Sequence, residues 1–524
     1  MSVIVADLPF ETATVVGVSV RKLTAALVKT LALASLLVSN MACQSFTGLT
    51  LSLQPNQTFQ TFHAWRGSLK HGPYWVDHSV SPPLPKLVSS SVLNRVLDDL
   101  VFDLGLTGVR INLPPRVETT NDNADPFSIN SSGFNFDRSW AGGSHKERFN
   151  DPVAQMQQII LPLKRRVEST GVPFSSYVSL GLEKSEIPRH WDRPDEYAEV
   201  GEAFLTYLKK TFDFEPNFWV IYNEPDLAGF SAREVAANIA ALGPRLKQKG
   251  FKTKIQYPET ETPGKAVPWV NAVLSDPRVT PYLGMIAFHS YDYNWQEAPA
   301  SFASRNALRE QAKKFGVMTG STETCCRYGG SSRSSYQYGL ENSRDIYFNL
   351  TEADAAVWEP FSIMESCSTR GCPGGGLIIG FENDLSTYYK QAHYYANRQY
   401  MSYIRPGDTR VGMTCAGCFT TSAGQNVKPV VFRSPAGTYV AVVINDQPSA
   451  QEIQFNGFPA GTYRITGVDP RNPTGKRYPD QAIAAGQSLS LEFPAQGILT
   501  IAQTTSGDRA VSPAGGVNPK IVPN

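Results

Sequence analysis

Short apolar runs alternate with amphipathic helical segments from about residue 90 to residue 400, and this alternation sharply limits the folds open to the chain. We expect strands at 109–113, 174–180, 219–222, 254–257, 285–288, 317–319 and 355–358. Helical spacing of apolar residues separates them, as in 231–249, which opens on a Ser-x-x-Glu capping box and ends before Gly250. Sustained strand–helix alternation predicts a parallel sheet, either closed into a barrel or open and doubly wound.

Polar residues follow several of these strands, where the chain leaves the sheet. No glycine-rich phosphate-binding loop follows any of them, which argues against a nucleotide-binding open sheet. A serine hydrolase on an open sheet is also disfavoured, because the sequence has no Gly-x-Ser-x-Gly elbow. The carboxyl ends of the strands are where a (β/α)8 barrel builds its site. We therefore predict an α/β protein with a (β/α)8 TIM barrel, and the polar residues at its strand ends are Arg110, Asn112, Asn223, Glu224, His289 and Glu323.

The pattern changes beyond about residue 405. Short alternating runs are separated by Gly, Pro and Asn turns, without helical periodicity, which predicts a C-terminal β-sandwich side domain. Residues after about 505 are rich in Ser, Pro, Gly and Asn and predict a disordered tail. The predicted division is a signal peptide at 1–43, an N-terminal strand segment at 44–62, the catalytic barrel at 63–404, the sandwich at 405–503 and the tail at 504–524.

The first 43 residues resemble an export signal. Basic residues precede the apolar run 31–38, which is too short to span a bilayer. Ala42 before Cys43 resembles a bacterial lipobox, in which the cysteine is acylated, although Asn40 stands where leucine is usual. Ordinary cleavage near Ala42 is the alternative. We expect a secreted or cell-surface protein, with a lipid anchor at Cys43 as one of the two outcomes.

Charge and cysteine content narrow the function classes. The net charge is +1 with no basic stripe, so we expect no nucleic-acid partner. Aromatic residues reach 11%, which favours stacking on sugar rings, although buried aromatics are the common alternative. Six of the seven cysteines remain when Cys43 is set aside, enough for up to three disulfides in an oxidising compartment. Cys415-Ala-Gly-Cys418 could be a redox or half-zinc motif, but a disulfide or idle thiols are preferred, because no second pair follows at zinc spacing.

Two glutamates at strand ends point to acid/base and nucleophilic chemistry. Glu224 lies in Ile221-Tyr-Asn-Glu-Pro-Asp226, and Glu323 lies three βα units later in the sequence, after the strand 317–319. Cleavage of a glycosidic bond with retention of configuration needs two carboxyl groups about 5–5.5 Å apart, which two strand ends of a barrel can supply. A single glutamate is usually a solvated loop carboxylate, but two at matching strand ends favour catalysis.

An ordered set of motifs resembles clan A of the glycoside hydrolases, and within it glycoside hydrolase family 30. The set spans roughly residues 46 to 503 and comprises Tyr222-Asn-Glu-Pro225, Ile286-Ala-Phe-His-Ser-Tyr291, Thr322-Glu-Thr-Cys-Cys326, the segments 343–346 and 356–358, 395–407 and 432–445. The resemblance implies that the strand around 48–53 joins the C-terminal sandwich. Two segments depart from the family pattern, 62–67 and 181–188, so substrate identity stays open.

The resemblance also implies roles for individual residues. Glu224 would be the acid/base and Glu323 the nucleophile, while Arg110 and Asn223 would support the substrate or the nucleophile. His289 and Tyr291 would line the site beside Glu323, although a packing role for His289 is an equal reading of the sequence. Trp358 would form part of the floor under the −1 sugar. The mechanism requires no cofactor and no metal, and we expect a monomer.

Within this interpretation, the substrate is a β-1,6-galactan, a β-1,6-glucan, a xylan, or a terminal glucoside, xyloside or fucoside on which the enzyme acts from the chain end. The alternative from another class is a catalytically silent carbohydrate-binding surface protein on the same scaffold. The presence of both glutamates argues against this alternative, because a binding protein would not need them.

Overall fold

The structure is a computed structural model. It describes residues 48–69, 74–77, 84–113, 118, 125–134, 136, 152–180, 192–292, 299–324, 335–367, 376–381, 384–416, 418, 420–421, 424–425 and 427–504. The predicted signal peptide with Cys43, and the predicted tail beyond Thr504, lie outside these residues. Among the described helices, none is long and apolar enough to cross a membrane.

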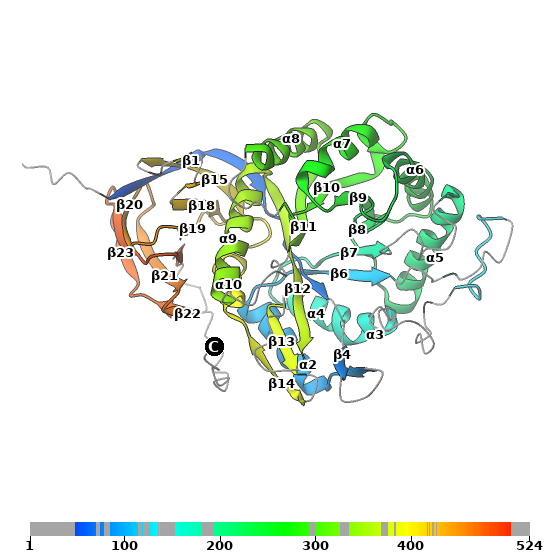
Figure 1. The fold of residues 1–524 in the computed structure, drawn as a ribbon, viewed down its shortest axis with the longest axis horizontal. Coiled ribbons are helices and arrows are strands. Elements are labelled where there is room, and N and C mark those ends of the chain that lie inside the picture. The colour runs from blue at the N-terminus through cyan, green and yellow to red at the C-terminus, as the bar shows by residue number, and fades with distance from the viewer. Residues whose placement is uncertain are drawn as a thin grey trace, which may run out of the picture. The chain divides into compact units, whose positions relative to one another are not determined.

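Parallel strands form the barrel (Figure 1), and from the second strand position to the last each strand is paired with the next one along the chain. The first strand position is occupied by two short strands, β2 and β3. In chain order the strands are β2 (Ala64–Trp65), β3 (Ser68–Leu69), β6 (Gly108–Leu113), β7 (Ser175–Leu180), β8 (Phe218–Val220), β9 (Lys254–Thr260), β10 (Leu283–His289), β11 (Met318–Thr324) and β12 (Ala355–Cys367).

The barrel is closed through the first strand position. On one side, the backbone N–H of Arg66 donates to the carbonyl of Trp358 on β12, at 3.1 Å. On the other side, the N–H of Arg110 on β6 donates to the carbonyl of Gly67, also at 3.1 Å. Because hydrogen bonds run around the whole ring, the predicted barrel is confirmed and the open-sheet alternative is excluded.

Helices surround the strands (Figure 1), and their apolar faces pack on the outside of the barrel. The expected capping box is present before α6: the Ser231 hydroxyl accepts from the Glu234 N–H, and the Glu234 carboxylate accepts from the Ser231 N–H. The helical segments are α2 (Ser90–Asp98), η1 (Asp99–Asp103), α3 (Pro152–Gln155), η3 (Met156–Ile160), α4 (Leu161–Ser169), α5 (Pro194–Phe212), α6 (Ala232–Gln248), α7 (Pro263–Leu274), η4 (Thr280–Tyr282), α8 (Pro299–Phe315), α9 (Ser335–Glu352) and α10 (Ala392–Met401).

The barrel interior is apolar at the beginnings of the strands and charged further along them. A small apolar cluster fills the first part and includes Phe218, Met285 and Val357. At later positions the inward side chains are polar, and they include Arg66 and Glu359, both fully buried. The polar end of the interior is therefore the end at which the predicted site residues gather.

A second sheet forms the sandwich, and its strand order is β22-β21-β25-β19-β18-β15-β1-β20-β24, with β23 beside β21. The N-terminal strand β1 runs between β15, which it meets antiparallel, and β20, which it meets in parallel. Its Leu51 lies opposite both Cys415 and Phe455. The strands are β1 (Leu49–Thr61), β15 (Thr409–Ala416), β18 (Val427–Arg433), β19 (Tyr439–Asn445), β20 (Gln451–Asn456), β21 (Gly461–Asp469), β22 (Asn472–Arg477), β23 (Gln481–Ile483), β24 (Leu489–Phe493) and β25 (Gly497–Gln503).

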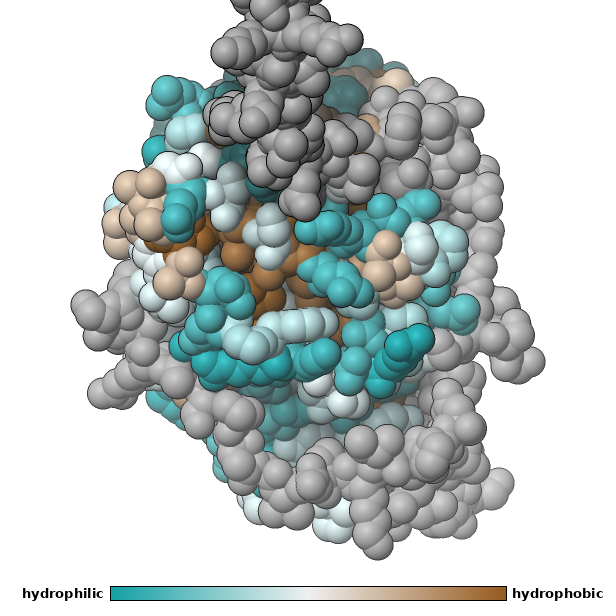
Figure 2. All heavy atoms as spheres, turned by 90° about the vertical axis from the view of Figure 1, so that its left-hand side faces the viewer, coloured by the Kyte–Doolittle hydropathy of each residue, from teal (hydrophilic) through white to brown (hydrophobic). Residues whose placement is uncertain are grey.

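The sandwich has its own apolar core and a largely polar outer face. Side chains alternate along its strands, so that Ile453 and Phe455 of β20 are buried while Glu452 and Gln454 are not. Figure 2 shows hydrophilic residues over much of the described surface on this side, with hydrophobic residues at the bottom of a hollow between them. This alternation is what the sequence predicts for a sandwich, and it completes the predicted fold class.

The other described strands form small pairs, of which only the first extends a larger sheet. A hairpin of β13 (Ile378–Phe381) and β14 (Asp384–Lys390) continues from the end of β12. The remaining pairs are β4 (Tyr74–Asp77) with β5 (Leu84–Leu87), and β16 (Thr420–Thr421) with β17 (Gly424–Gln425).

Barrel and sandwich are joined by polar contacts along α9. Arg344 of α9 makes an ion pair with Asp446 at 2.8 Å, and Lys428 of β18 reaches the same carboxylate at 2.6 Å. The hydroxyl of Tyr336, also on α9, donates to the carbonyl of Gln496 at 2.6 Å. The sandwich is thus attached to the helix that precedes the last barrel strand.

One of the predicted disulfide alternatives is present. Cys415 and Cys418 are bonded to each other, with their Cα atoms 5.5 Å apart, so the motif serves as a local crosslink. Cys325, Cys326 and Cys372 lie outside the described residues, and Cys367 is described only in its backbone.

Candidate active site

Glu224 lies in a tight turn directly after β8. Its backbone is in the left-handed region, with φ of 43°, which is unfavourable for a residue other than glycine. Hydrogen bonds hold it there: its N–H donates to the carbonyl of Glu259 at 3.0 Å, and its carbonyl accepts from the N–H groups of Leu227 and Ala228, both at 2.9 Å. The turn aims the carboxylate at the barrel interior.

A stacked aromatic pair brackets this turn in sequence. Tyr222 comes just before Glu224 and Phe230 comes after the turn, and their rings lie 3.9 Å apart and nearly parallel. Both are buried in the layer between strands and helices. The pair fixes the path of the turn and therefore the direction of the Glu224 side chain.

Glu323 lies on β11, and both of its carboxylate oxygens are held by donors. Arg110 contacts Oε2 at 2.6 Å, and the Tyr291 hydroxyl donates to Oε1 at 2.9 Å. The Glu323 side chain is 8% exposed, whereas that of Glu224 is 21% exposed. The structure therefore presents one enclosed, ionically paired carboxylate and one more open to solvent.

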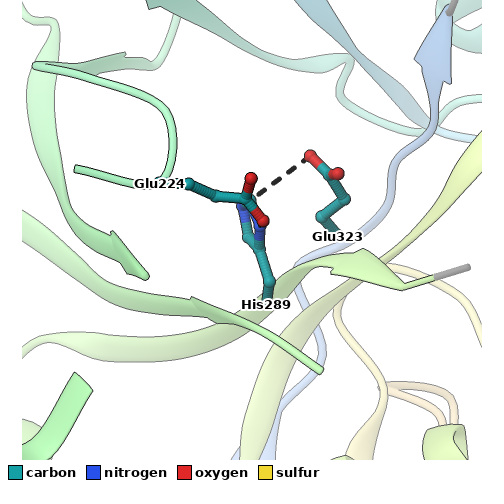
Figure 3. A group of neighbouring side chains, drawn as sticks. All are labelled: Glu224, His289 and Glu323. Atoms are coloured by element: carbon teal, nitrogen blue, oxygen red, sulfur yellow. Dashed lines mark hydrogen bonds and ion pairs between the residues drawn. The ribbon is translucent and has the colours of Figure 1, made fainter. Parts of the chain in front are cut away.

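Glu224 and Glu323 face each other across the barrel mouth. Figure 3 shows Glu224 beside His289, with Glu323 opposite. One oxygen of each carboxylate and a ring nitrogen of His289 all lie within 4.8 Å of one another. This spacing matches the short separation used by retaining glycosidases rather than the 6.5–9.5 Å that is typical of inverting ones.

Arg110 connects the two glutamate-bearing strand ends. One end of its guanidinium contacts Glu323, and the other donates to Asn223 Oδ1 at 2.8 Å and to Ser179 Oγ at 3.2 Å. Burial by itself lowers the pKa of Arg110, but Tyr177 and the charge of Glu323 raise it above its usual range. Arg110 is thus a permanent cation that orients Glu323 and Asn223 together.

His289 lies between Glu224 and a second buried glutamate, Glu259. Its Nδ1 is 2.9 Å from Glu224 Oε1, and its Nε2 is 3.2 Å from Glu259 Oε2. Burial alone lowers the pKa of His289, but Glu323 and its two bonded carboxylates raise it well above the ordinary value. His289 is therefore part of the polar cluster and not merely a packing residue.

Trp358 is a correction to the sequence interpretation. It is fully buried and its indole Nε1 donates to Asp345 of α9 at 2.8 Å, so it points outward into the helix layer. The next residue, Glu359, points inward and accepts from the Tyr177 hydroxyl at 2.9 Å. Successive strand residues face opposite sides. The prediction that Trp358 forms the floor under a sugar is therefore wrong.

The sequence interpretation also missed charged residues inside the barrel. Glu259, Glu359 and Arg66 are all fully buried beneath the predicted site. Burial raises the pKa of Glu359 to about 8, against the lowering effect of Arg110 and Arg66. The rule that found Glu224, a carboxylate directly after a predicted strand, also fits Glu259 in Tyr257-Pro-Glu259.

The spacing of Glu224, His289 and Glu323 would also suit a metal ion. In this structure their ligand atoms are already used, because Arg110 and Tyr291 hold Glu323, and Glu224 holds one nitrogen of His289. A guanidinium 2.6 Å from Glu323 supplies the positive charge that an ion would bring. The donor set fits a carboxylate pair for acid/base chemistry better than a metal centre.

Sequence comparison finds a relative over most of the chain, although no family model matches. The chain is 22% identical to mouse lysosomal acid glucosylceramidase over 429 residues, which cover 76% of this chain and 78% of that protein.

Solved structures share the fold. The catalytic domain of GH30 xylanase C from Talaromyces cellulolyticus has a TM-score of 0.60 at 18% identity, covering 87% of this chain and 100% of that one. The endo-β-1,6-glucanase BT3312 has a TM-score of 0.60 at 15% identity, covering 88% and 95%. The relative, the shared fold and the strand-end motifs together confirm the resemblance of this chain to glycoside hydrolase family 30 of clan A.

Proposed function

We propose that the protein is a retaining β-glycoside hydrolase that works by double displacement with Glu323 and Glu224. The observation that carries this proposal is the approach of one oxygen of each carboxylate to within 4.8 Å of the other, from strand ends that face each other across the barrel mouth. A water molecule cannot be placed between the sugar and so close a carboxylate, so the second carboxylate must attack the sugar itself.

Glu323 is the nucleophile in this proposal. Arg110 and Tyr291 orient it by contacting its two carboxylate oxygens, and its low exposure limits competition from water. One oxygen forms a bond to the anomeric carbon while the bond from that carbon to the leaving oxygen breaks. Glu323 loses its negative charge when the glycosyl ester forms, and water hydrolyses this ester in the second step.

Glu224 is the acid and then the base. It gives its proton to the leaving oxygen in the first step and takes a proton from water in the second. Its larger exposure suits both tasks, because the leaving group and the incoming water must reach it from outside. Asn223 uses its Oδ1 to accept from Arg110, so its amide nitrogen is the group that can donate to a sugar hydroxyl.

The proposed substrate is an extracellular or cell-wall polysaccharide of the β-1,6-galactan, β-1,6-glucan or xylan type. The similar structures include a xylanase and an endo-β-1,6-glucanase, and the sequence relative is named for a glucosylceramide substrate. The name of the endo-β-1,6-glucanase states a β linkage, which supports the class of bond. The export-like N-terminus supports action outside the cytoplasm, whether the protein is free or lipid-anchored.

A substrate panel tests this function. The purified protein is incubated with xylan, β-1,6-glucan, β-1,6-galactan and aryl β-glycosides, beside Glu224→Gln and Glu323→Gln variants. We expect wild-type turnover of at least one substrate, a product that appears first as the β-anomer by NMR, and loss of turnover in both variants. An α-anomer as first product would contradict retention, and a folded wild type silent on the whole panel would favour the binding-protein alternative.

Arg110→Met is expected to lower kcat/KM strongly while leaving the fold intact. The change removes the cation from the buried Glu323 and releases Asn223. Breaking a buried pair costs about 3–5 kcal/mol, and a loss of that size in the transition state corresponds to roughly two to four orders of magnitude in kcat/KM. Steady-state kinetics on the best substrate of the panel measures it.

Arg245→Met is the matched control for Arg110→Met. Arg245 is equally buried and makes an ion pair with Glu202 in the helix layer, far along the chain from the strand ends. We expect Arg245→Met to lower the melting temperature with little change in kcat. A similar loss of kcat in both variants would show that Arg110 acts only through stability.

A further inference from the structure

Glu259 is a fully buried carboxylate whose surroundings make it an acceptor only. Its Oε1 accepts from Gln256 Nε2 at 2.6 Å and from Thr322 Oγ1 at 2.8 Å. Arg66 donates to Gln256 Oε1 at 2.9 Å, so the amide is oriented with its nitrogen towards Glu259. Although burial raises the pKa of Glu259, its hydrogen bonds with His289, Gln256 and Thr322 bring it below the ordinary value. Glu259 is therefore ionised.

Two irregular strand positions bring these groups together. Glu259 falls at a register shift between β9 and β10, and its φ is 64°. Thr322 falls at a register shift between β10 and β11, directly before Glu323. Such irregularities redirect side chains and are frequent next to active sites. Here they aim Glu259 at His289 and at the strand that carries Glu323.

Because Glu259 can only accept hydrogen bonds, it determines which ring nitrogens of His289 carry a hydrogen. The Nε2 of His289 faces Glu259 Oε2 and must carry a hydrogen, since Glu259 has none to give. The Nδ1 faces Glu224 Oε1. Glu323 Oε2 lies 3.8 Å from Nε2, so His289 has carboxylates on all these sides. Both ring nitrogens are therefore protonated.

We propose that Glu259 is a positioning residue that holds His289 as an imidazolium, so that its Nδ1–H supports Glu224 in both steps of the reaction. This inference rests on the proposed function of Glu224 as acid/base. The proton of Glu224 resides on Oε2 and passes to the leaving oxygen, while Oε1 accepts from His289 Nδ1–H throughout. The negative charge left on Glu224 is then stabilised by a hydrogen bond that already exists.

The charged groups around Glu259 and His289 determine the direction in which the pH profile of kcat/KM moves when Glu259 is changed. Glu224, Glu323 and the ring of Tyr291 face His289. Arg66, Arg110, Tyr177 and Glu359 act on Glu259 through space. Glu259→Gln removes one negative charge from this cluster, and a less negative cluster binds its protons less tightly. The basic limb of kcat/KM must therefore move to lower pH.

Glu259→Gln is expected to shift the basic limb of the kcat/KM profile by about one pH unit or more, and only where proton donation matters. With a phenyl β-glycoside, a poor leaving group, we expect this shift and a fall in kcat/KM of about 10²-fold at neutral pH, within the range of general acid catalysis. With a 2,4-dinitrophenyl β-glycoside, which leaves without a proton, we expect a much smaller change. Glu259→Asp, which keeps the charge, is expected to restore most of the profile.

Glu359→Gln is the matched control. Glu359 is also fully buried inside the barrel, but it contacts Tyr177 rather than His289. With a pKa of about 8 it is mostly protonated at neutral pH, so an amide replaces a neutral group. We expect the basic limb to stay in place. An equal shift in both variants, or an equal shift with both leaving groups in Glu259→Gln, would overturn the proposal.

The protonation of His289 gives a readout that needs no turnover. In protein labelled with ¹⁵N-histidine, the His289 signals are assigned by their absence in His289→Gln. We expect both nitrogens to stay protonated from pH 5 to pH 8 in wild type, and one of them to lose its proton within this range in Glu259→Gln. A wild-type His289 that titrates near 6.5 contradicts the proposal, and this measurement does not depend on whether Glu259→Gln folds. If wild type hydrolyses nothing, the proposed function fails, and the NMR titration still decides the role of Glu259.

Discussion

Glu323→Ala is expected to abolish hydrolysis and to gain a different reaction when azide is added. Removal of the nucleophile prevents formation of the glycosyl ester, and we expect kcat to fall by roughly 10⁴-fold or more. The truncated side chain leaves room between Arg110 and Tyr291, whose donors held both carboxylate oxygens. Azide can enter there and attack a 2,4-dinitrophenyl β-glycoside from the α face. The measurement is NMR identification of an α-glycosyl azide.

The configuration of the azide adduct makes this test specific to Glu323. Glu202→Gln, a change at a buried carboxylate paired with Arg245, is expected to keep hydrolysis and to form no azide adduct. A β-glycosyl azide from Glu323→Ala would mean that a nucleophile other than Glu323 still acts. Residual hydrolysis close to that of wild type would remove Glu323 from the mechanism.

Glu224→Ala is expected to discriminate strongly between leaving groups. General acid catalysis contributes about 10²–10⁴-fold, so kcat/KM for a phenyl glycoside or a polysaccharide should fall by that factor. For a 2,4-dinitrophenyl glycoside the first step needs no proton, and kcat/KM should change little. The second step lacks its base, so kcat falls and the glycosyl ester on Glu323 accumulates. Pre-steady-state kinetics should show a burst of dinitrophenol.

Azide is also expected to rescue Glu224→Ala, but with the opposite stereochemistry. It attacks the glycosyl ester from the β face, where Glu224 activated water, and releases a β-glycosyl azide. Asn223→Ala provides the control, because it keeps the acid/base and should reduce kcat/KM similarly for all leaving groups. A uniform loss in Glu224→Ala would indicate a binding role for Glu224 rather than proton transfer.

The strand-end rule predicted much of the candidate site. Glu224, Glu323, Arg110 and His289 were chosen as strand-end residues and Tyr291 through the family resemblance, and the fold brings all five into one polar cluster. This succeeds because the ends of parallel barrel strands must converge, whatever the details of packing. Which residues follow which strands can be read from the sequence without knowing any side-chain direction.

Side-chain direction is what the sequence could not supply. Barrel strands are buried on both faces, so apolar residues follow one another without alternation and the sequence does not mark which side faces inward. The family resemblance assigned Trp358 to the site, and nothing in the strand's composition showed that Trp358 points outward and its neighbour Glu359 inward. Glu259 follows a predicted strand and could have been chosen by the same rule, but the register shift and left-handed backbone that turn it towards His289 are not visible in the sequence.

The position of β1 bears on how the chain assembles as it is made. β1 is among the first described segments to leave the ribosome, yet it must wait for β15, which follows the whole barrel, and then for β20. The barrel strands pair mostly with neighbours along the chain and can form earlier. Pairing across such a separation is entropically costly and slow. The sandwich therefore closes last, at the moment when β1 gains a hydrogen-bonded partner on each of its two edges.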